Sequence, residues 1–96
     1  MSDSRSNSAK KASYSLVSTD SFLKDLRKLD STTNRRILET VELLKSDPHL
    51  GKNLRGPLEG LQSLRVGDFR VIYSIEEETR TITLRAAGHR RSIYRG

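Results

Sequence analysis

The chain has 96 residues with no cysteine and no tryptophan, and 33% of its residues are hydrophobic. This length makes one small domain with a lean core, and the lack of cysteine excludes disulfide bonds and thiolate metal sites. A formal charge of +6 and a pI near 10.1 favour a polyanion or an acidic protein as partner. The lack of cysteine fits a reducing cytoplasm, so we expect a cytoplasmic protein. No run approaches the roughly 20 apolar residues of a membrane span, so no membrane partner is expected.

Residues 1–11 are rich in serine and charge and contain almost nothing that a core could bury. This composition predicts a disordered leader, and residues 12–96 are expected to form a single domain. Tyr14, Leu16 and Val17 lie in a short β-like run, which predicts the first strand near the start of that domain.

Two amphipathic helices are predicted next, because apolar residues recur there with the helical period. Thr19 or Asp20 can cap the first helix, and Ser31 or Thr32 can cap the second. The apolar positions are Phe22, Leu23, Leu26 and Leu29 in the first helix and Ile37, Leu38, Val41 and Leu44 in the second. Pro48 ends the second helix, since the residue before a proline resists helical geometry. The prediction is a helical hairpin with one apolar face.

The segment 47–60 is a long connector that contains several glycines and both prolines. A connector of this length in a small domain is often functional. Its leucines are expected to hold it against the core. Lys52 and Arg55 add positive charge and are candidate RNA- or ribosome-binding residues.

Beyond Gly60 the apolar pattern changes to the two-residue period of strands. The Gly-Asp pair at 67–68 predicts a tight hairpin turn, residues 69–75 form the strongest predicted strand, and the last strand is predicted at 81–84. Strands joined by short turns favour an antiparallel meander. We therefore predict an α+β fold of order β-α-α-β-β-β, with the N-terminal helical hairpin packed on one face of an antiparallel sheet.

Arg65 and Arg70 flank the predicted turn and are expected to lie close together on adjacent strands. Strand alternation places Arg70 and Ile72 on one face and Phe69, Val71 and Tyr73 on the other. Two neighbouring guanidiniums repel each other unless an anion bridges them, which indicates a phosphate site. The alternative is that each arginine reaches into water or pairs with a glutamate at 76–78.

The C-terminal segment 87–96 combines an imidazole, several guanidiniums and a phenol with one apolar anchor, Ile93. Histidine exchanges a proton near neutral pH, arginine forks bind phosphate oxygens, and a tyrosine ring stacks on a base. The segment therefore predicts a place where single-stranded RNA is held and cut, and the alternative is an ordinary basic tail docked by Ile93 or Tyr94. The catalytic candidates are His89, Arg90 and Tyr94, and the candidates for RNA or ribosome binding are Arg91 and Arg95.

Three segments resemble the RelE branch of the RelE/ParE toxin superfamily: 64–73 (LRVGDFRVIY), 88–94 (GHRRSIY) and 52–56 (KNLRG) in the connector. The likeness covers residues 13–96. It implies the toxin of a type II toxin–antitoxin system, a ribosome-dependent endoribonuclease that cleaves mRNA in the A site and inhibits translation. It also implies a cognate acidic antitoxin that neutralises the toxin in a hetero-oligomer.

The resemblance assigns roles to single residues. Arg70 matches the arginine that contacts the scissile phosphate, Arg90 the arginine that acts as general acid or stabilises the leaving group, and Tyr94 the tyrosine that stacks on a nucleotide. Leu61 and Ser63 stand where the best-studied branch has basic residues, one of which is the base there. The spacing of the tail is also shorter than in that branch.

The implied reaction needs neither a metal nor a cofactor, because the ribose 2′-hydroxyl attacks the adjacent phosphate and gives a 2′,3′-cyclic phosphate and a free 5′-hydroxyl. Arg65 and Arg70 would offset the charge of the phosphorane, and His89 is the candidate base in place of the missing lysine. Arg90, with a pKa above ~12, is expected to act electrostatically. Two alternatives stay open on the same fold: a ParE-like inhibitor of DNA gyrase and an inactive homologue that binds only the antitoxin.

Overall fold

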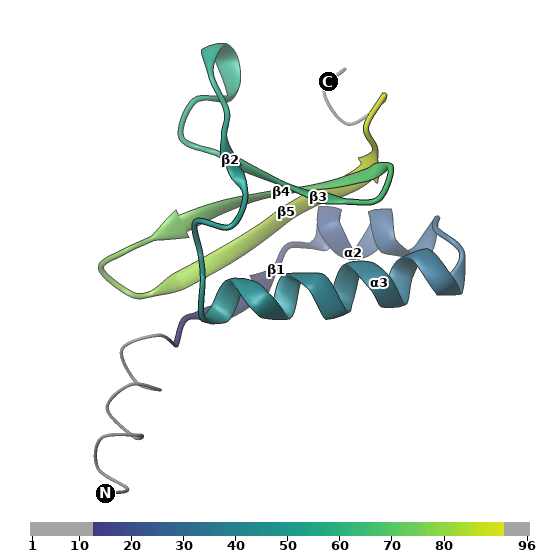
Figure 1. Cartoon of the computed structure of the whole chain (residues 1–96), viewed down its shortest axis with the longest axis horizontal. Coiled ribbons are helices and arrows are strands. Elements are labelled where there is room, and N and C mark those ends of the chain that lie inside the picture. Colours follow the sequence, from purple (N-terminus) through teal and green to yellow (C-terminus); the bar gives the residue numbers. More distant parts are fainter. Residues whose placement is uncertain (1–12, 92–96) are drawn as a thin grey trace, which may run out of the picture.

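The computed structural model describes residues 13–91, which form one sheet with two helices lying along one of its faces (Figure 1). The strands are β1 (Ser15–Ser18), β2 (Lys52–Asn53), β3 (Gln62–Val66), β4 (Phe69–Glu76) and β5 (Thr81–His89). The helices are α2 (Asp20–Arg27) and α3 (Ser31–Val41), with 3₁₀ turns η1 (Glu42–Lys45) and η2 (Gly56–Leu58). The predicted α+β class and element order are confirmed, with the short strand β2 added inside the connector. The leader predicted at 1–11 lies outside the described residues.

The sheet has the strand order β1-β5-β4-β3-β2. The pairs β2–β3, β3–β4 and β4–β5 are antiparallel, as predicted. The pair β1–β5 is parallel, so the prediction of a wholly antiparallel sheet is wrong at this edge. The helical hairpin and the meander separate β1 from β5 along the chain, which provides the long connection that two parallel strands require.

Thr19 begins α2 and ties it to the sheet. Its Oγ1 accepts a hydrogen bond from the Phe22 backbone N–H at 3.1 Å, and the hydroxyl lies 3.0 Å from the Leu84 carbonyl oxygen, to which it donates. One side chain therefore satisfies a free N–H at the helix start and fixes the helix against β5.

Asp30 is the N-cap of α3, directly before the predicted Ser31 and Thr32. Aspartate and serine are about equally good caps, so residue type alone does not choose between such neighbours. The chain leaves α3 through η1, which ends three residues before Pro48. No helix within residues 13–91 is long and apolar enough to span a bilayer.

The core lies between the helices and the sheet face that they cover (Figure 1). Its largest fully buried side chains are Tyr73, Phe22, Ile37, Leu44, Ile82, Leu84, Val41 and Val71. Burying a large apolar side chain of this kind contributes about 1.5–3 kcal/mol. Leu23 and Leu38 were expected on the apolar faces of the helices but are 39% and 44% exposed, so the buried stripe is narrower than predicted.

The β3–β4 hairpin has the predicted two-residue turn, and Gly67 has φ 63°. A positive φ at the first turn position is characteristic of a type II′ turn and favours glycine. The turn fixes the register, so each residue of β3 has a defined partner on β4.

The last strand does not end at residue 84 as predicted, because β5 continues through His89. The register shifts once between β4 and β5, where Tyr73 pairs with Leu84 and Ile72 pairs with Ala86. Arg85 is the extra residue of this bulge. Bulges of this kind redirect a side chain, and this one influences which groups lie on the sheet face away from the helices.

Candidate functional site

Arg65 and Arg70 are paired residues on β3 and β4, which confirms that the hairpin brings them together. They lie on the sheet face opposite the core, since their neighbours Leu64 and Val71 face the helices and are buried. Arg65 Nε donates to the Gly67 carbonyl at 3.3 Å, and Arg70 Nη1 donates to a backbone carbonyl on its own strand at 3.3 Å. Each guanidinium keeps further donors for a ligand.

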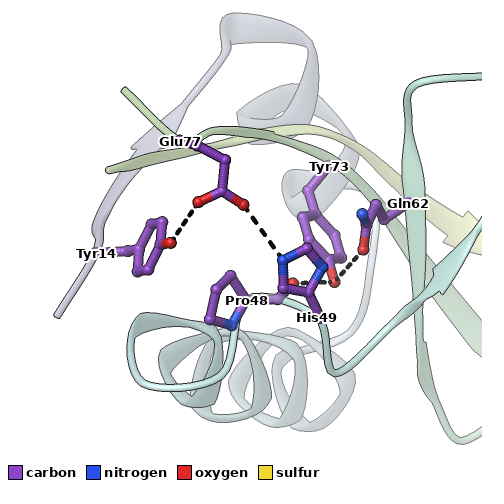
Figure 2. Close-up of polar contacts among 6 residues, drawn as sticks. All are labelled: Tyr14, Pro48, His49, Gln62, Tyr73 and Glu77. Carbon is purple, nitrogen blue, oxygen red and sulfur yellow. Dashed lines mark hydrogen bonds and ion pairs between the residues drawn. The ribbon is translucent and has the colours of Figure 1, made fainter. Parts of the chain in front are cut away.

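No carboxylate within residues 13–91 forms an ion pair with Arg65 or Arg70. The alternative pairing with a glutamate at 76–78 is therefore not what the structure has. Glu77 accepts a hydrogen bond from the Tyr14 hydroxyl at 2.6 Å and lies 3.3 Å from His49 Nε2 (Figure 2). Like charges directly opposite on neighbouring strands repel each other, and an anion bound between them would remove the repulsion.

A pocket of about 320 Å³ lies beside the two arginines. The connector forms one wall through Leu50, Gly51, Lys52, Asn53 and Leu54, and the sheet forms the other through Ser63, Arg65 and Arg70. Lys52 on β2 pairs with Ser63 on β3, two residues along from the Arg65–Arg70 row. That step is roughly 7 Å along the strand, so three cationic residues surround one hollow.

Tyr73 connects the core to this connector, a role that the sequence prediction missed. Its ring is fully buried, and its hydroxyl donates to the Pro48 carbonyl at 2.8 Å and accepts from the Gly51 N–H at 3.0 Å. The side-chain amide of Gln62 lies 3.3 Å from the same hydroxyl (Figure 2). Burial raises the pKa of Tyr73, which keeps the hydroxyl neutral and able to donate. The signal available in the sequence was a tyrosine at a core position, because a buried hydroxyl needs partners.

His89 lies away from the two arginines. It ends β5 opposite Phe69, whereas Arg70 is opposite Gly88, so strand alternation places the imidazole on the face of Phe69. The His89 and Phe69 rings meet edge to face with centroids 5.6 Å apart, and His89 Nδ1 accepts a hydrogen bond from the Arg91 N–H at 3.2 Å. The sequence prediction had the chain leave the sheet before His89. In the structure β5 continues through His89, and the bulge at Arg85 reverses the alternation of the residues after it, which places the ring on the other side.

The other predicted site residues are partly described. Arg90 is exposed, and its backbone N–H donates to the Asp68 carbonyl at 2.9 Å, so it stands next to the β3–β4 turn near the arginine pair. Arg91 is exposed, and Arg55 is exposed in the connector on the rim of a second hollow of about 610 Å³. Tyr94 and Arg95 lie outside the described residues.

Arg85 is a cationic residue that the sequence prediction passed over. Its Nε donates to Ser74 Oγ at 3.1 Å, and Ser74 follows Arg70 and Ile72 in alternation along β4. Arg85 follows the buried Leu84, so ordinary strand alternation places it on the same face as the arginine pair. No residue pattern in the local sequence indicates the bulge at Arg85.

Polar contacts at the other end of the sheet involve Tyr14, His49 and Glu77 (Figure 2). The hydrogen bond from Tyr14, followed by the His49 contact, lowers the pKa of Glu77, and the same bond to Glu77 raises the pKa of Tyr14. Within residues 13–91 no three His, Asp or Glu side chains come together in a way that could hold a metal ion.

The sequence matches the family described as ParE toxin of type II toxin-antitoxin system, parDE, over residues 16–94. It is 34% identical over 84 residues to Toxin RelE of Mycobacterium tuberculosis, which covers 85% of this chain and 87% of that relative. It is 32% identical to Toxin RelG of the same organism, which covers 85% of this chain and 97% of that relative.

Solved structures give a matching result. The toxin–antitoxin complex RelBE2 of M. tuberculosis contains a chain similar to this one, with a TM-score of 0.78 and 31% identity over 82% of this chain and 93% of that chain. The archaeal RelE–RelB complex of Pyrococcus horikoshii contains another, with a TM-score of 0.67 and 26% identity over 88% of this chain and 99% of that chain.

Proposed function

The chain belongs to the RelE branch of the RelE/ParE superfamily of type II toxins, and on this basis we propose that it is a ribosome-dependent endoribonuclease that cleaves mRNA in the A site and so inhibits translation. The observation that carries this proposal is the Arg65–Arg70 pair, which lies beside a pocket and has no carboxylate partner within residues 13–91. Such a pair suits a phosphate with developing negative charge.

The reaction proposed is attack of a ribose 2′-hydroxyl on the adjacent phosphorus. The 2′-hydroxyl loses its proton as the new O–P bond forms. The bond to the 5′-oxygen breaks, and that oxygen takes up a proton from water, which leaves a 2′,3′-cyclic phosphate and a 5′-hydroxyl. Arg65 and Arg70 stabilise the charge on the phosphorane, and Arg90 stabilises the leaving oxygen from its place beside the β3–β4 turn. Tyr94 is proposed to stack on a nucleotide. No metal or cofactor is assigned a step.

The base that accepts the 2′-proton is the one role for which this protein's site offers no well-placed residue among residues 13–91. His89 can take that role only if the end of β5 rearranges on RNA binding, because its imidazole lies on the face of Phe69. A site with a poorly placed base relies on a host surface to orient the substrate. We therefore expect ribosomes to accelerate cleavage strongly and naked RNA to be cut slowly.

The partner proposed besides ribosome and mRNA is an antitoxin that forms a hetero-oligomer with this toxin. The similar chains of known structure include members of toxin–antitoxin complexes. The formal charge of +6 makes an acidic partner favourable. An acidic segment that folds on the toxin would neutralise the cationic face and cover exposed apolar side chains.

Primer extension on transcripts tests the proposed activity. After induction of the toxin, we expect cuts inside translated codons, growth arrest, and 5′-hydroxyl ends that a kinase labels without prior phosphatase. In a purified translation system, cuts should require ribosomes and persist with a chelator that removes catalytic transition metals while ribosomal Mg²⁺ is kept. Growth arrest without transcript cuts would contradict nuclease function.

Inhibition of DNA gyrase is a second candidate, because the matching family carries the ParE description. In that case induction should cause DNA damage linked to gyrase, and translated transcripts should stay intact. A folded protein that causes neither effect but still binds its antitoxin would be an inactive homologue.

A further inference from the structure

We propose that Tyr73 is a positioning residue for RNA, because its buried hydroxyl fixes the connector so that Lys52 stands beside Arg65 and Arg70. This inference rests on the proposed function and adds to it a core residue that does not itself touch the RNA. It also explains why the fully buried Tyr73 has its hydroxyl directed toward the connector.

The Tyr73 hydroxyl holds two backbone groups that are separated along the connector. It donates to the Pro48 carbonyl at 2.8 Å (Figure 2). It also accepts from the Gly51 N–H at 3.0 Å, and Tyr73 is 0% exposed. The ring belongs to the core cluster between sheet and helices, so it cannot move without disturbing that packing. A rigid ring thus sets the place of two connector peptides.

Gly51 shows how closely the connector is pressed against this anchor. A Cβ added there would lie 2.6 Å from the Ser63 carbonyl oxygen and 2.7 Å from the Tyr73 hydroxyl. Both distances are shorter than a side chain tolerates, so the close approach requires glycine. Lys52 directly follows Gly51, so no intervening residue separates the peptide held by Tyr73 from the cationic side chain.

The strand that carries Lys52 is too short to fix its own position on the sheet. β2 has two residues, and among residues 13–91 it lies at the edge of the sheet and pairs only with β3. Lys52 is paired with Ser63, which precedes Arg65 by two residues and therefore shares its face. The Tyr73 anchor, directly before Lys52, supplies the restraint that this short pair lacks.

Two further contacts hold the connector. Beyond Lys52, the Leu54 N–H donates to the Leu61 carbonyl at 3.0 Å. Before Lys52, the second contact is weak. His49 meets Glu77 at 3.3 Å with 63% and 59% of the two side chains exposed. Exposed pairs of this kind are screened by water and salt and contribute little. The buried hydroxyl is therefore the contact that fixes the connector on the N-terminal side of Lys52.

The test compares Tyr73→Phe, Lys52→Ala and the double variant for binding to a single-stranded RNA whose 2′-positions are methylated, so that it cannot be cut. Loss of one phosphate contact lowers the slope of log affinity against log salt by about 0.7, which corresponds to about fivefold weaker binding at 0.1 M salt. We expect this change from each single variant and no further change from the double variant. A purely structural tyrosine would lower the melting temperature and leave the salt slope unchanged.

Tyr14→Phe is the matched control, because it removes a tyrosine hydroxyl that bonds Glu77 and not the connector; its salt slope should equal that of the parent. A folded Tyr73→Phe protein with the parental slope, or additive effects in the double variant, would overturn the inference. If Tyr73→Phe does not fold, Gly51→Ala displaces the same junction with the tyrosine intact, and a parental slope in that variant is equally decisive. A parent protein that neither binds nor cuts RNA would reject the proposed function, and this inference with it.

Discussion

Replacing Arg70 with glutamine should separate function from stability in this protein. Arg70 faces Arg65 across the β3–β4 hairpin, and directly opposite side chains begin about 5 Å apart at Cβ. Two guanidiniums about 6 Å apart repel each other by about 0.7 kcal/mol in a water-like dielectric, and salt reduces this. Glutamine keeps most of the stem that packs on the sheet, so Arg70→Gln should raise the free energy of unfolding by about 0.3–0.7 kcal/mol at low salt.

The same change should abolish most of the activity. Removing one preorganised donor to a developing oxyanion typically costs about 100- to 1,000-fold in rate. The slope of log RNA affinity against log salt should fall by about 0.7, since one phosphate contact is lost. A protein that is more stable and yet inactive cannot have lost activity through unfolding.

The assays are urea unfolding at low salt and in 1 M salt, cleavage of mRNA on ribosomes, and RNA binding at several salt concentrations. Arg36→Gln is the matched control, because Arg36 is an exposed arginine of α3, on the helix side of the sheet. It should cleave and bind like the parent. A loss of about 1 kcal/mol or more of stability in Arg70→Gln, or cleavage by Arg70→Gln at the parental rate, would contradict this prediction.

Three further predictions concern stability and pH. Asp25→Ala should lower the free energy of unfolding by about 1.5–3 kcal/mol in urea titrations. The reason is that Asp25 Oδ2 accepts a hydrogen bond from the Ala87 N–H of β5 at 2.9 Å. A loss near zero would mean that water replaces the carboxylate. Thr19→Ala should cost about 1 kcal/mol by the same measurement, and Thr19→Ser should restore most of it. Tyr14→Phe should move the pKa of Glu77 back up toward its ordinary value in an NMR titration, because the Tyr14 hydroxyl is the main cause of the lowered pKa. A carboxyl group whose pKa is lower in the folded than in the unfolded protein stabilises the fold at pH values above the unfolded pKa. This stabilisation is lost as the pH falls through the folded pKa. Because the variant has less of it, the variant should lose less stability than the parent on acidification.

Much of the fold could be predicted because its determinants are local. The helical period, the Thr19 cap and the Gly67–Asp68 turn each act over a few residues, and each is confirmed. The turn also fixed the Arg65–Arg70 pair, since a two-residue hairpin leaves only one register for its flanking residues. The cationic pair of the candidate site was therefore predictable before any contact was known.

The remaining features depend on contacts between distant segments, and only the tertiary structure decided them. β1 is parallel to β5 because the helical hairpin carries the chain to the far edge of the sheet, and β5 runs on to His89 because β4 offers it partners that far. The bulge at Arg85 turns the imidazole of His89 away from the arginines, because without the extra residue strand alternation would place His89 on their face. Strand alternation has a period of two, so one additional paired or bulged residue reverses the face of every side chain that follows. Sequence supplied the residue types of the site, and long-range strand pairing decided which of them share a face.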